Sequence, residues 1–310
     1  MTGNFLDDLK YQFRYGGIHL QLLFINVGLF LLINLLFLLD TLFMTSGIFG
    51  RIVDLLFVLP PDFASLLYKP WTLFTYMFAH IGLLHILGNM IFLYFGGQLF
   101  RSLLGERRLL YTYLVGGIVG AIIQIAANEF IPFFMLRSST GMIGASAAVM
   151  AVFIAVAFYR PNAKVLFFGI FPISLIVLAI IFMALDFINL AKDDNVGHLA
   201  HLGGALLGYL SVQNVHSSSN FLSKIEIWGD RKWMQIRNLF KRKPRMKVYK
   251  NTSRSNHESK NTRVKTDEEF LAEKKANQAR IDAILDKISK KGYESLTKEE
   301  KQFLFKQSKE

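Results

Sequence analysis

Four polar side chains that could carry out hydrolysis stand in apolar surroundings in this sequence. Ser146 lies in the stretch GMIGASAAVMAVF, His85 and Asn89 lie in HIGLLHILGN, and His201 lies in GHLAHLGG. A serine hydroxyl becomes a nucleophile when a base takes its proton, and a histidine can be that base. Attack on a carbonyl creates an oxyanion, which needs preorganised hydrogen-bond donors. These residue types therefore suit hydrolysis, provided that the fold brings three distant segments together.

Six apolar segments are candidates for the helices that position these residues. Crossing the hydrocarbon core of a bilayer takes roughly 20 mostly apolar residues, and 52% of this chain is hydrophobic. The expected spans are 19–43, 85–104, 109–127, 146–160, 165–187 and 196–213. The fourth is short, which favours a helix enclosed by the others. The pattern predicts an all-α membrane protein, a six-transmembrane-helix bundle with a small helical C-terminal tail.

The direction of the spans predicts one shared site. The second, fourth and sixth spans run the same way through the membrane, so His85, Asn89, Ser146 and His201 fall within about 10 Å of one depth at a rise of about 1.5 Å per residue. His85 and Asn89 are four residues apart and share a helix face. The backbone N–H of Ser146, at a helix start, is a further oxyanion donor. Asp186 is the nearest acid by sequence, but we do not assign it to the site and predict a Ser–His dyad.

Small residues indicate where two spans approach closely. His201, Gly204 and Gly208 form one stripe on the sixth span, and alanines keep the facing fourth span slim. Stripes of small residues let membrane helices pack at short distance. The pattern therefore predicts that His201 comes within hydrogen-bond reach of Ser146.

Charge divides the chain into a membrane body and a basic tail. Residues 1–213 carry 11 Lys+Arg and 10 Asp+Glu, whereas 214–310 carry 24 and 13. Positive charge in the short inner loops predicts that both termini are cytoplasmic. The domains expected are a cytoplasmic N-terminal segment (1–18), a six-span core (19–213), an amphipathic and polybasic linker (214–265) and a helical hairpin (266–310). There are no cysteines, which excludes disulfides and thiolate chemistry.

The tail contains two features that suit a membrane surface. Residues 222–240 resemble an amphipathic helix that lies on the inner leaflet through Ile225, Trp228, Trp233 and Ile236. The polybasic run at 241–250 favours contact with anionic lipid over nucleic acid. Residues 251–264 have a disordered composition. Thr297 is the expected N-cap of the last helix.

Two other interpretations stay open on the residues alone. A lone serine in a membrane helix often only bonds back to a carbonyl one turn earlier, and a silent membrane-protein binder would need no chemistry. His80, His85, His198 and His201 could instead bind a metal or haem. The zinc-protease signature His-Glu-x-x-His is absent, and nothing in the sequence implies a metal or an organic cofactor.

Taken together, the motifs resemble those of the rhomboid intramembrane serine proteases over about residues 15–213. The matching residues are His80, His85 and Asn89, then Gly144-Ala145-Ser146, then Ala200-His201-Leu202-Gly203-Gly204. The resemblance implies that Ser146 is the nucleophile and His201 the general base. It implies oxyanion binding by His85, Asn89 and the Ser146 amide, with packing or support from Gly144, Gly204, Gly208, His80 and His198.

The same resemblance implies how the protein acts and where. It implies cleavage of transmembrane protein substrates near the outer face of the membrane, with 44–84 as a membrane-dipping loop and the fifth span as a mobile gate. The tail is reminiscent of bacterial relatives, so we expect a multi-pass protein of a bacterial inner membrane. Ala147 replaces the usual glycine, and Trp71-Thr72 replaces Trp-Arg, so we expect retained activity and a more loosely anchored loop. The sequence does not indicate an oligomeric state.

Overall fold

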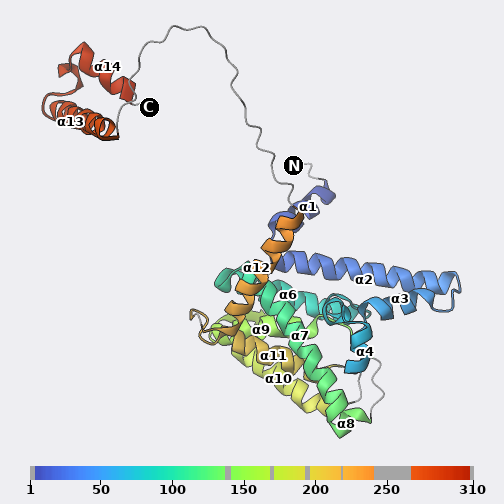
Figure 1. Cartoon of the computed structure of the whole chain (residues 1–310). Coiled ribbons are helices and arrows are strands. Elements are labelled where there is room, and N and C mark those ends of the chain that lie inside the picture. The colour runs from blue at the N-terminus through green and yellow to red at the C-terminus, as the bar shows by residue number, and fades with distance from the viewer. Residues whose placement is uncertain are drawn as a thin grey trace. The chain divides into compact units, whose positions relative to one another are not determined.

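The computed structural model describes residues 4–136, 141–167, 171–192, 196–217, 219–240 and 267–307 (Figure 1). The described chain is mostly helical, and it divides into two compact units, Met1–Lys243 and Pro244–Glu310. The polybasic run and the segment predicted to be disordered lie outside the described residues.

Six main helices of the first unit correspond to the six expected spans. They are α2 (Ile18–Leu42), α6 (Leu83–Leu104), α7 (Glu106–Phe130), α9 (Ser146–Tyr159), α10 (Leu175–Ile188) and α11 (His198–Val212). Within the described residues, α2, α6 and α7 are long and apolar enough to cross a membrane by themselves, while α9 and the segment Leu175–Ala191 are apolar but shorter. The predicted class, an all-α bundle of apolar helices, is confirmed.

The fifth predicted span is wrong at its beginning. Residues expected to start a helix near 165 form an antiparallel hairpin of β1 (Lys164–Phe167) and β2 (Phe171–Ser174), and α10 begins only at Leu175. Pro172 has no backbone N–H to donate and disfavours helical geometry in the residue before it. The surrounding β-branched and aromatic residues are well suited to a strand.

Helix α9 is the centre of the bundle and packs against α6, α7, α10 and α11. Ten of its 14 residues are buried, which confirms the prediction of an enclosed helix. Burial on all sides explains why α9 is apolar around its whole circumference. A short helix without a lipid-facing surface can therefore hold its first residue, Ser146, at a fixed depth.

The connection between α2 and α6 is built from short helices. These are α3 (Ile48–Phe57), α4 (Phe63–Tyr68), α5 (Thr72–Thr75) and the 3-10 turn η1 (Tyr76–Phe78). The Trp71 indole N–H donates to the Leu55 carbonyl at 2.9 Å, and the Lys69 ammonium lies 3.1 Å from Asp54. The hydroxyl of the buried Thr72 donates to the Lys69 carbonyl. These contacts anchor the segment even though it lacks the Trp-Arg pair.

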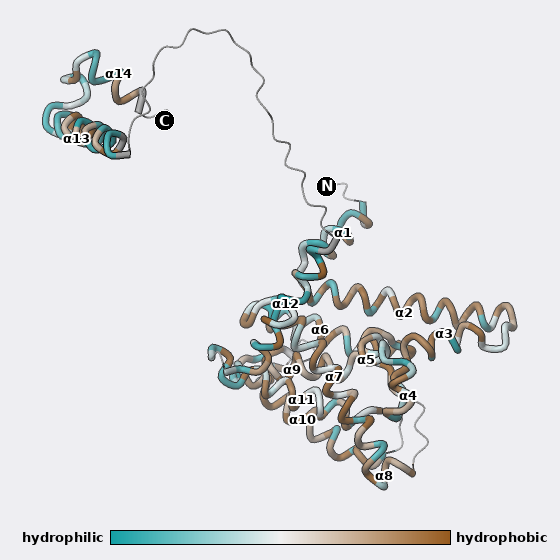
Figure 2. The backbone as a smooth tube through the Cα atoms, in the orientation of Figure 1, coloured by the Kyte–Doolittle hydropathy of each residue, from teal (hydrophilic) through white to brown (hydrophobic). Residues whose placement is uncertain are grey.

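Hydropathy along the chain separates the two units (Figure 2). The bundle helices are mainly hydrophobic, whereas α13 (Asp267–Lys291) and α14 (Lys298–Gln307) alternate between hydrophilic and hydrophobic residues. Gly292, with a φ of 76°, leads from α13 into the 3-10 turn η3 (Tyr293–Ser295). Thr297 caps α14 as predicted, because its hydroxyl accepts from the Glu300 backbone N–H while the Glu300 carboxylate accepts from the Thr297 N–H.

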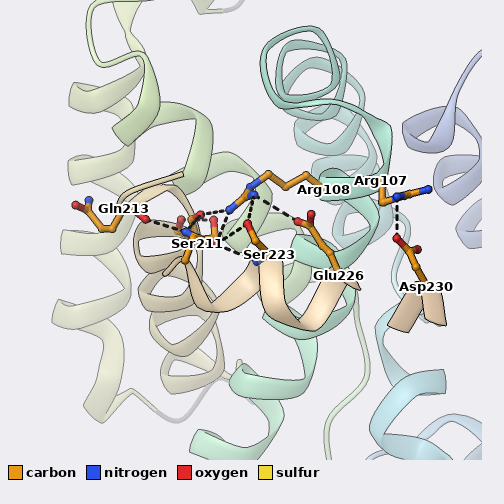
Figure 3. A network of polar contacts seen from close by, with 9 residues as sticks. Arg107, Arg108, Ser211, Gln213, Ser223, Glu226 and Asp230 are labelled. Carbon is orange, nitrogen blue, oxygen red and sulfur yellow. Dashed lines mark hydrogen bonds and ion pairs between the residues drawn. The ribbon is translucent and has the colours of Figure 1, made fainter. Parts of the chain in front are cut away.

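Helix α12 (Phe221–Phe240) belongs to the first unit and is held there by a polar cluster that we call the Arg108 network (Figure 3). Its members are Arg108, Ser211, Asn220, Ser223 and Glu226. The buried Arg108 guanidinium donates to the Ser211 carbonyl at 2.6 Å, to Asn220 at 2.8 Å and to Ser223 at 3.2 Å, and lies 3.5 Å from the Glu226 carboxylate. Asn220 in turn donates to the Ser211 carbonyl and accepts from the Ser223 N–H. The network joins the ends of α7, α11 and α12.

The remaining described elements are short or terminal. They are α1 (Phe5–Tyr15), α8 (Pro132–Met135) and the 3-10 turn η2 (Asn189–Ala191) that follows α10.

Candidate active site

Ser146 is the first residue of α9, and a tight segment before it sets its position. Met142 pairs with Leu59 through two backbone hydrogen bonds of 2.9 Å, and the Gly144 N–H donates to the Tyr76 carbonyl at 3.0 Å. Gly144 has a φ of 141°, a conformation that side-chain-bearing residues rarely adopt. A Cβ at Gly144 would also stand 2.6 Å from the His85 ring. The glycine of the Gly-x-Ser motif is therefore required both by its backbone and by its neighbour.

The structure brings Ser146 and His201 into direct contact. His201 Nε2 lies 2.7 Å from Ser146 Oγ, and His201 Nδ1 lies 2.9 Å from Asp186 Oδ1. A carboxylate can only accept, so the proton of the ring is on Nδ1 and the Nε2 lone pair is left to face the serine hydroxyl. This tautomer is the one that a general base for Ser146 needs.

His198 shares the same carboxylate oxygen. Its Nδ1 lies 2.7 Å from Asp186 Oδ1, and both side chains are buried. We call Ser146, His201, Asp186 and His198 the Ser146 cluster. The metal-binding nitrogen and oxygen atoms of Asp186, His198 and His201 lie within 4.8 Å of one another, so this group could hold a metal ion. The direct hydrogen bonds already account for its arrangement, and we assign no metal to it.

The close approach of α9 and α11 depends on glycine. A Cβ added at Gly204 would stand 2.1 Å from the Ala147 carbonyl oxygen, and one at Gly208 would stand 2.3 Å from the Ala151 carbonyl oxygen. Backbone atoms cannot move aside as a flexible side chain can. The predicted small-residue contact between these helices is thus present. The methyl group of Ala147 faces Gly120 on α7. A Cβ at Gly120 would stand 2.7 Å from that methyl carbon, so the methyl group has space because position 120 is a glycine.

His80, His85 and Asn89 form a third group beside Ser146. The Asn89 amide nitrogen lies 2.9 Å from His80 Nε2, and the Ala145 backbone N–H donates to the same nitrogen at 3.3 Å. The His85 ring packs edge-on against His80, with 5.0 Å between the ring centroids. The Asn89 amide is therefore engaged with His80 in this state, while His85 is exposed and lines the space in front of Ser146.

A partly open cavity of about 770 Å³ gives access to these groups. Its polar lining comprises His85, Asn89, Ser146, Asp186, Asn189, His198 and His201. The apolar lining includes Phe92, Phe153 and Phe182, whose rings pack edge-to-face with centroids 4.9 to 6.1 Å apart. A mostly apolar cavity with a few convergent polar groups is the usual form of a binding site.

The site departs from the sequence prediction at Asn89, whose amide is engaged with His80, and at Asp186. The sequence predicts a Ser–His dyad, yet the Asp186 carboxylate lies beside both histidines of α11. One sequence feature could have placed Asp186 in the site. It is the sole ionisable residue in an apolar segment, and intramembrane ionisable residues indicate functional sites by default. Its position could not be read from sequence, because the start of α10 was misplaced by about ten residues and the position of its end relative to α11 was unknown.

Comparison with known proteins finds a family match over part of the chain. Residues 68–217 match the family model of the rhomboid domain. The chain contains a rhomboid domain. The C-terminal residues 265–310 separately match a family of unknown function (DUF6576), in the part of the chain that forms α13 and α14.

Relatives of this rhomboid domain occur in several settings. The chain is 30% identical over 150 residues to RHOMBOID-like protein 12, mitochondrial, of Arabidopsis thaliana. It is 28% identical over 182 residues to Presenilin-associated rhomboid-like protein A, mitochondrial, of Danio rerio, and 28% identical over 141 residues to Rhomboid protease GluP of Bacillus subtilis. These matches cover 45%, 54% and 46% of this chain, and 45%, 42% and 25% of the relatives' lengths.

The relatives do not indicate in which membrane the protein resides. Two carry mitochondrial names and one is bacterial, so the expectation of a bacterial inner membrane has no support from them. They also include both a protease and proteins named only as rhomboid-like. The match shows a rhomboid domain over residues 68–217, and catalysis is a matter for the site itself.

Proposed function

We propose that this rhomboid protein is an intramembrane serine endopeptidase that cleaves transmembrane protein substrates. The single observation that carries the proposal is the contact of 2.7 Å between Ser146 Oγ and His201 Nε2 on the wall of the cavity. A serine bonded only to its own helix would not engage a histidine 55 residues away. The contact has the geometry of an activated nucleophile.

The proposed reaction follows from these atoms. Ser146 Oγ attacks the carbonyl carbon of the scissile peptide bond while its proton passes to His201 Nε2. The tetrahedral intermediate collapses, the C–N bond breaks, and His201 gives the proton to the departing amine. A water molecule then attacks the ester on Ser146, loses a proton to His201, and releases the new carboxylate and the free serine.

The oxyanion would be held by groups around the start of α9. The Ser146 backbone N–H stands in the first turn of a helix, where it lacks a carbonyl partner within the helix and the helix dipole favours negative charge. His85 lines the cavity on the other side. Asn89 joins them when its amide turns from His80 toward the substrate. Donors fixed in advance are worth most where water is excluded.

We further propose that both termini lie on the side of the basic loops. Arg107 and Arg108, at the start of α7, stand next to α12, whose Trp228, Trp233 and Ile236 are more than 45% exposed. Aromatic and aliphatic side chains of an amphipathic helix suit a membrane interface. In this cysteine-free chain, single cysteines at Ile236 and Leu67 would react with an impermeant maleimide from opposite sides. Reaction from the same side would overturn this placement.

Labelling with a fluorescent fluorophosphonate tests the proposed activity. The wild type in detergent should be labelled, whereas Ser146→Ala and His201→Ala should not, since one lacks the nucleophile and the other its base. Ser102→Ala is the matched control, because Ser102 is an exposed serine bonded only to a carbonyl of its own helix. A metal chelator should leave labelling unchanged.

The same experiment decides between the enzyme and a silent membrane-protein binder. Folded wild type that takes up no label, or Ser146→Ala that is labelled at the wild-type rate, would defeat the protease proposal. Loss of labelling on chelation would instead favour a metal held by Asp186, His198 and His201.

A further inference from the structure

Helix α10 carries one polar side chain, and that side chain reaches the proposed base. The sequence of α10 is LIVLAIIFMALDFI, in which Asp186 stands alone among apolar residues. Its side chain is 11% exposed, and its Oδ1 accepts from His201 Nδ1 at 2.9 Å and from His198 Nδ1 at 2.7 Å. A carboxylate at this depth is costly unless it is paired, so its two imidazole partners are what stabilise it there.

We propose that Asp186, supplied by α10, is a positioning residue that makes the proposed base His201 competent. The proposal rests on the proposed protease function and adds to it how the base is oriented. The carboxylate holds the His201 proton on Nδ1, which directs Nε2 to Ser146. It also stabilises the positive charge that the ring acquires when it takes the serine proton.

The carboxylate belongs to a helix that forms one wall of the cavity. Phe182, Leu185 and Asp186 of α10 line the cavity, whereas Ile180, Ile181 and Ile188 on the same helix are 44% to 73% exposed. Helix α10 is thus a wall of the cavity with an outer apolar face. The orienting carboxylate therefore comes from the wall of the cavity and not from the helix that carries the base.

His198 gives the carboxylate a fixed place. Two N–H donors from one face of α11 converge on a single oxygen, which limits how the Asp186 side chain can rotate. The titratable groups around His201 are Asp186 from α10, His198 from its own helix and His85 from α6, with Ser146 from α9 in contact. Any measured pH dependence has to be read against all of these groups.

The rate of fluorophosphonate labelling across pH tests the proposal. Asp186→Asn keeps the shape but cannot fix the tautomer, so labelling should fall by about 10²- to 10⁴-fold. The pH profile of labelling should change as well, because the carboxylate no longer faces the ring. Asp186→Glu should recover part of the rate that Asn loses, since it keeps the carboxylate. Ile180→Ala, on the exposed face of α10, should change neither quantity.

A spectroscopic measurement keeps the test independent of catalysis. In ¹⁵N-histidine-labelled Ser146→Ala protein, two strongly deshielded imidazole N–H protons should mark the bonds from His198 and His201 to Asp186. If wild type is not labelled but both resonances are present, the protease proposal fails while the positioning contact stands. If wild type is labelled, and Asp186→Asn is labelled at the same rate and with the same pH profile, the positioning role is overturned. Should Asp186→Asn fail to fold, absence of the His201 resonance would overturn it instead.

Discussion

Two buried polar clusters lie at opposite ends of α11 and differ in what surrounds them. The Ser146 cluster uses His198 and His201 in the first turn of the helix, and the Arg108 network uses the carbonyl of Ser211 near its end. Ten residues separate His201 from Ser211, or about 15 Å of helix. Both clusters contain ionisable groups in an apolar bundle, and both contain hydrogen bonds of 2.6 to 2.9 Å.

The difference lies in access and in the order of donors and acceptors. Every residue of the Ser146 cluster lines the cavity, whereas none of the Arg108 network lines it. The donors of the Arg108 network bind backbone carbonyls and a helix-capping side chain. Its hydrogen bonds are therefore used to join three helix ends. The Ser146 cluster forms a directed chain from carboxylate to imidazole to hydroxyl, and that hydroxyl faces open space. Burial and charge alone therefore do not identify a site; a cavity and a reactive end do.

The largest effect is expected where the Ser146 cluster depends on backbone contact. Gly204→Ala would place a methyl group 2.1 Å from the Ala147 carbonyl oxygen, forcing α9 and α11 apart while Ser146 and His201 keep their identity. Displacing reactive groups by about 1 Å can cost about 10²-fold in rate. Labelling by fluorophosphonate should fall by at least that factor.

Gly28→Ala on α2 is the matched control, since a Cβ there would meet no atom within 4 Å. It should label like the wild type. Undiminished labelling of Gly204→Ala would show that the short distance between α9 and α11 is not what joins Ser146 to His201.

The sequence predicted the Ser146 cluster better than the Arg108 network, for physical reasons. Ser146 and His201 stand in motifs whose small neighbours reveal the helix contact, so their meeting could be inferred. Arg108 looked like an ordinary inner-loop charge, and Asn220 like part of a linker, because the fold-back of α12 leaves no periodic signal. Glu226 gave no signal either, since its partner Arg108 stands 118 residues earlier in the sequence. Long-range polar pairs without a pattern of their own require the structure.

A smaller effect, and of another kind, is expected from the Arg108 network. Arg108→Met should lower the free energy of unfolding by about 2 kcal/mol, because it leaves the Ser211 carbonyl, Asn220 and the Glu226 carboxylate without their charged donor. Protein that remains folded should take up label at the wild-type rate, since the cavity is untouched. Thermal unfolding in detergent and labelling below the transition measure the two quantities separately.

Asp230→Asn is the comparison variant on α12. It breaks the 2.8 Å ion pair with Arg107, in which the arginine side chain is 70% exposed, and such pairs are worth less than about 1 kcal/mol. A large loss of labelling in folded Arg108→Met protein would contradict the separation of the two clusters and would couple the C-terminal end of α11 to the site.

The smallest effect is expected at Glu300, where a partly exposed polar contact forms part of neither cluster. The Thr297 backbone N–H and the Lys287 ammonium hold the pKa of the Glu300 carboxyl below its ordinary value. A carboxyl with a lowered folded-state pKa stabilises the fold above its unfolded-state pKa, and that contribution is lost as the pH falls through the folded-state value. Hydrogen exchange in α14 should therefore lose protection at acid pH in the wild type but not in Glu300→Gln. Equal loss of protection in the two proteins would show that the Glu300 cap contributes no measurable stability to α14. The difference in energetic importance between this cap and the two buried clusters would then be larger.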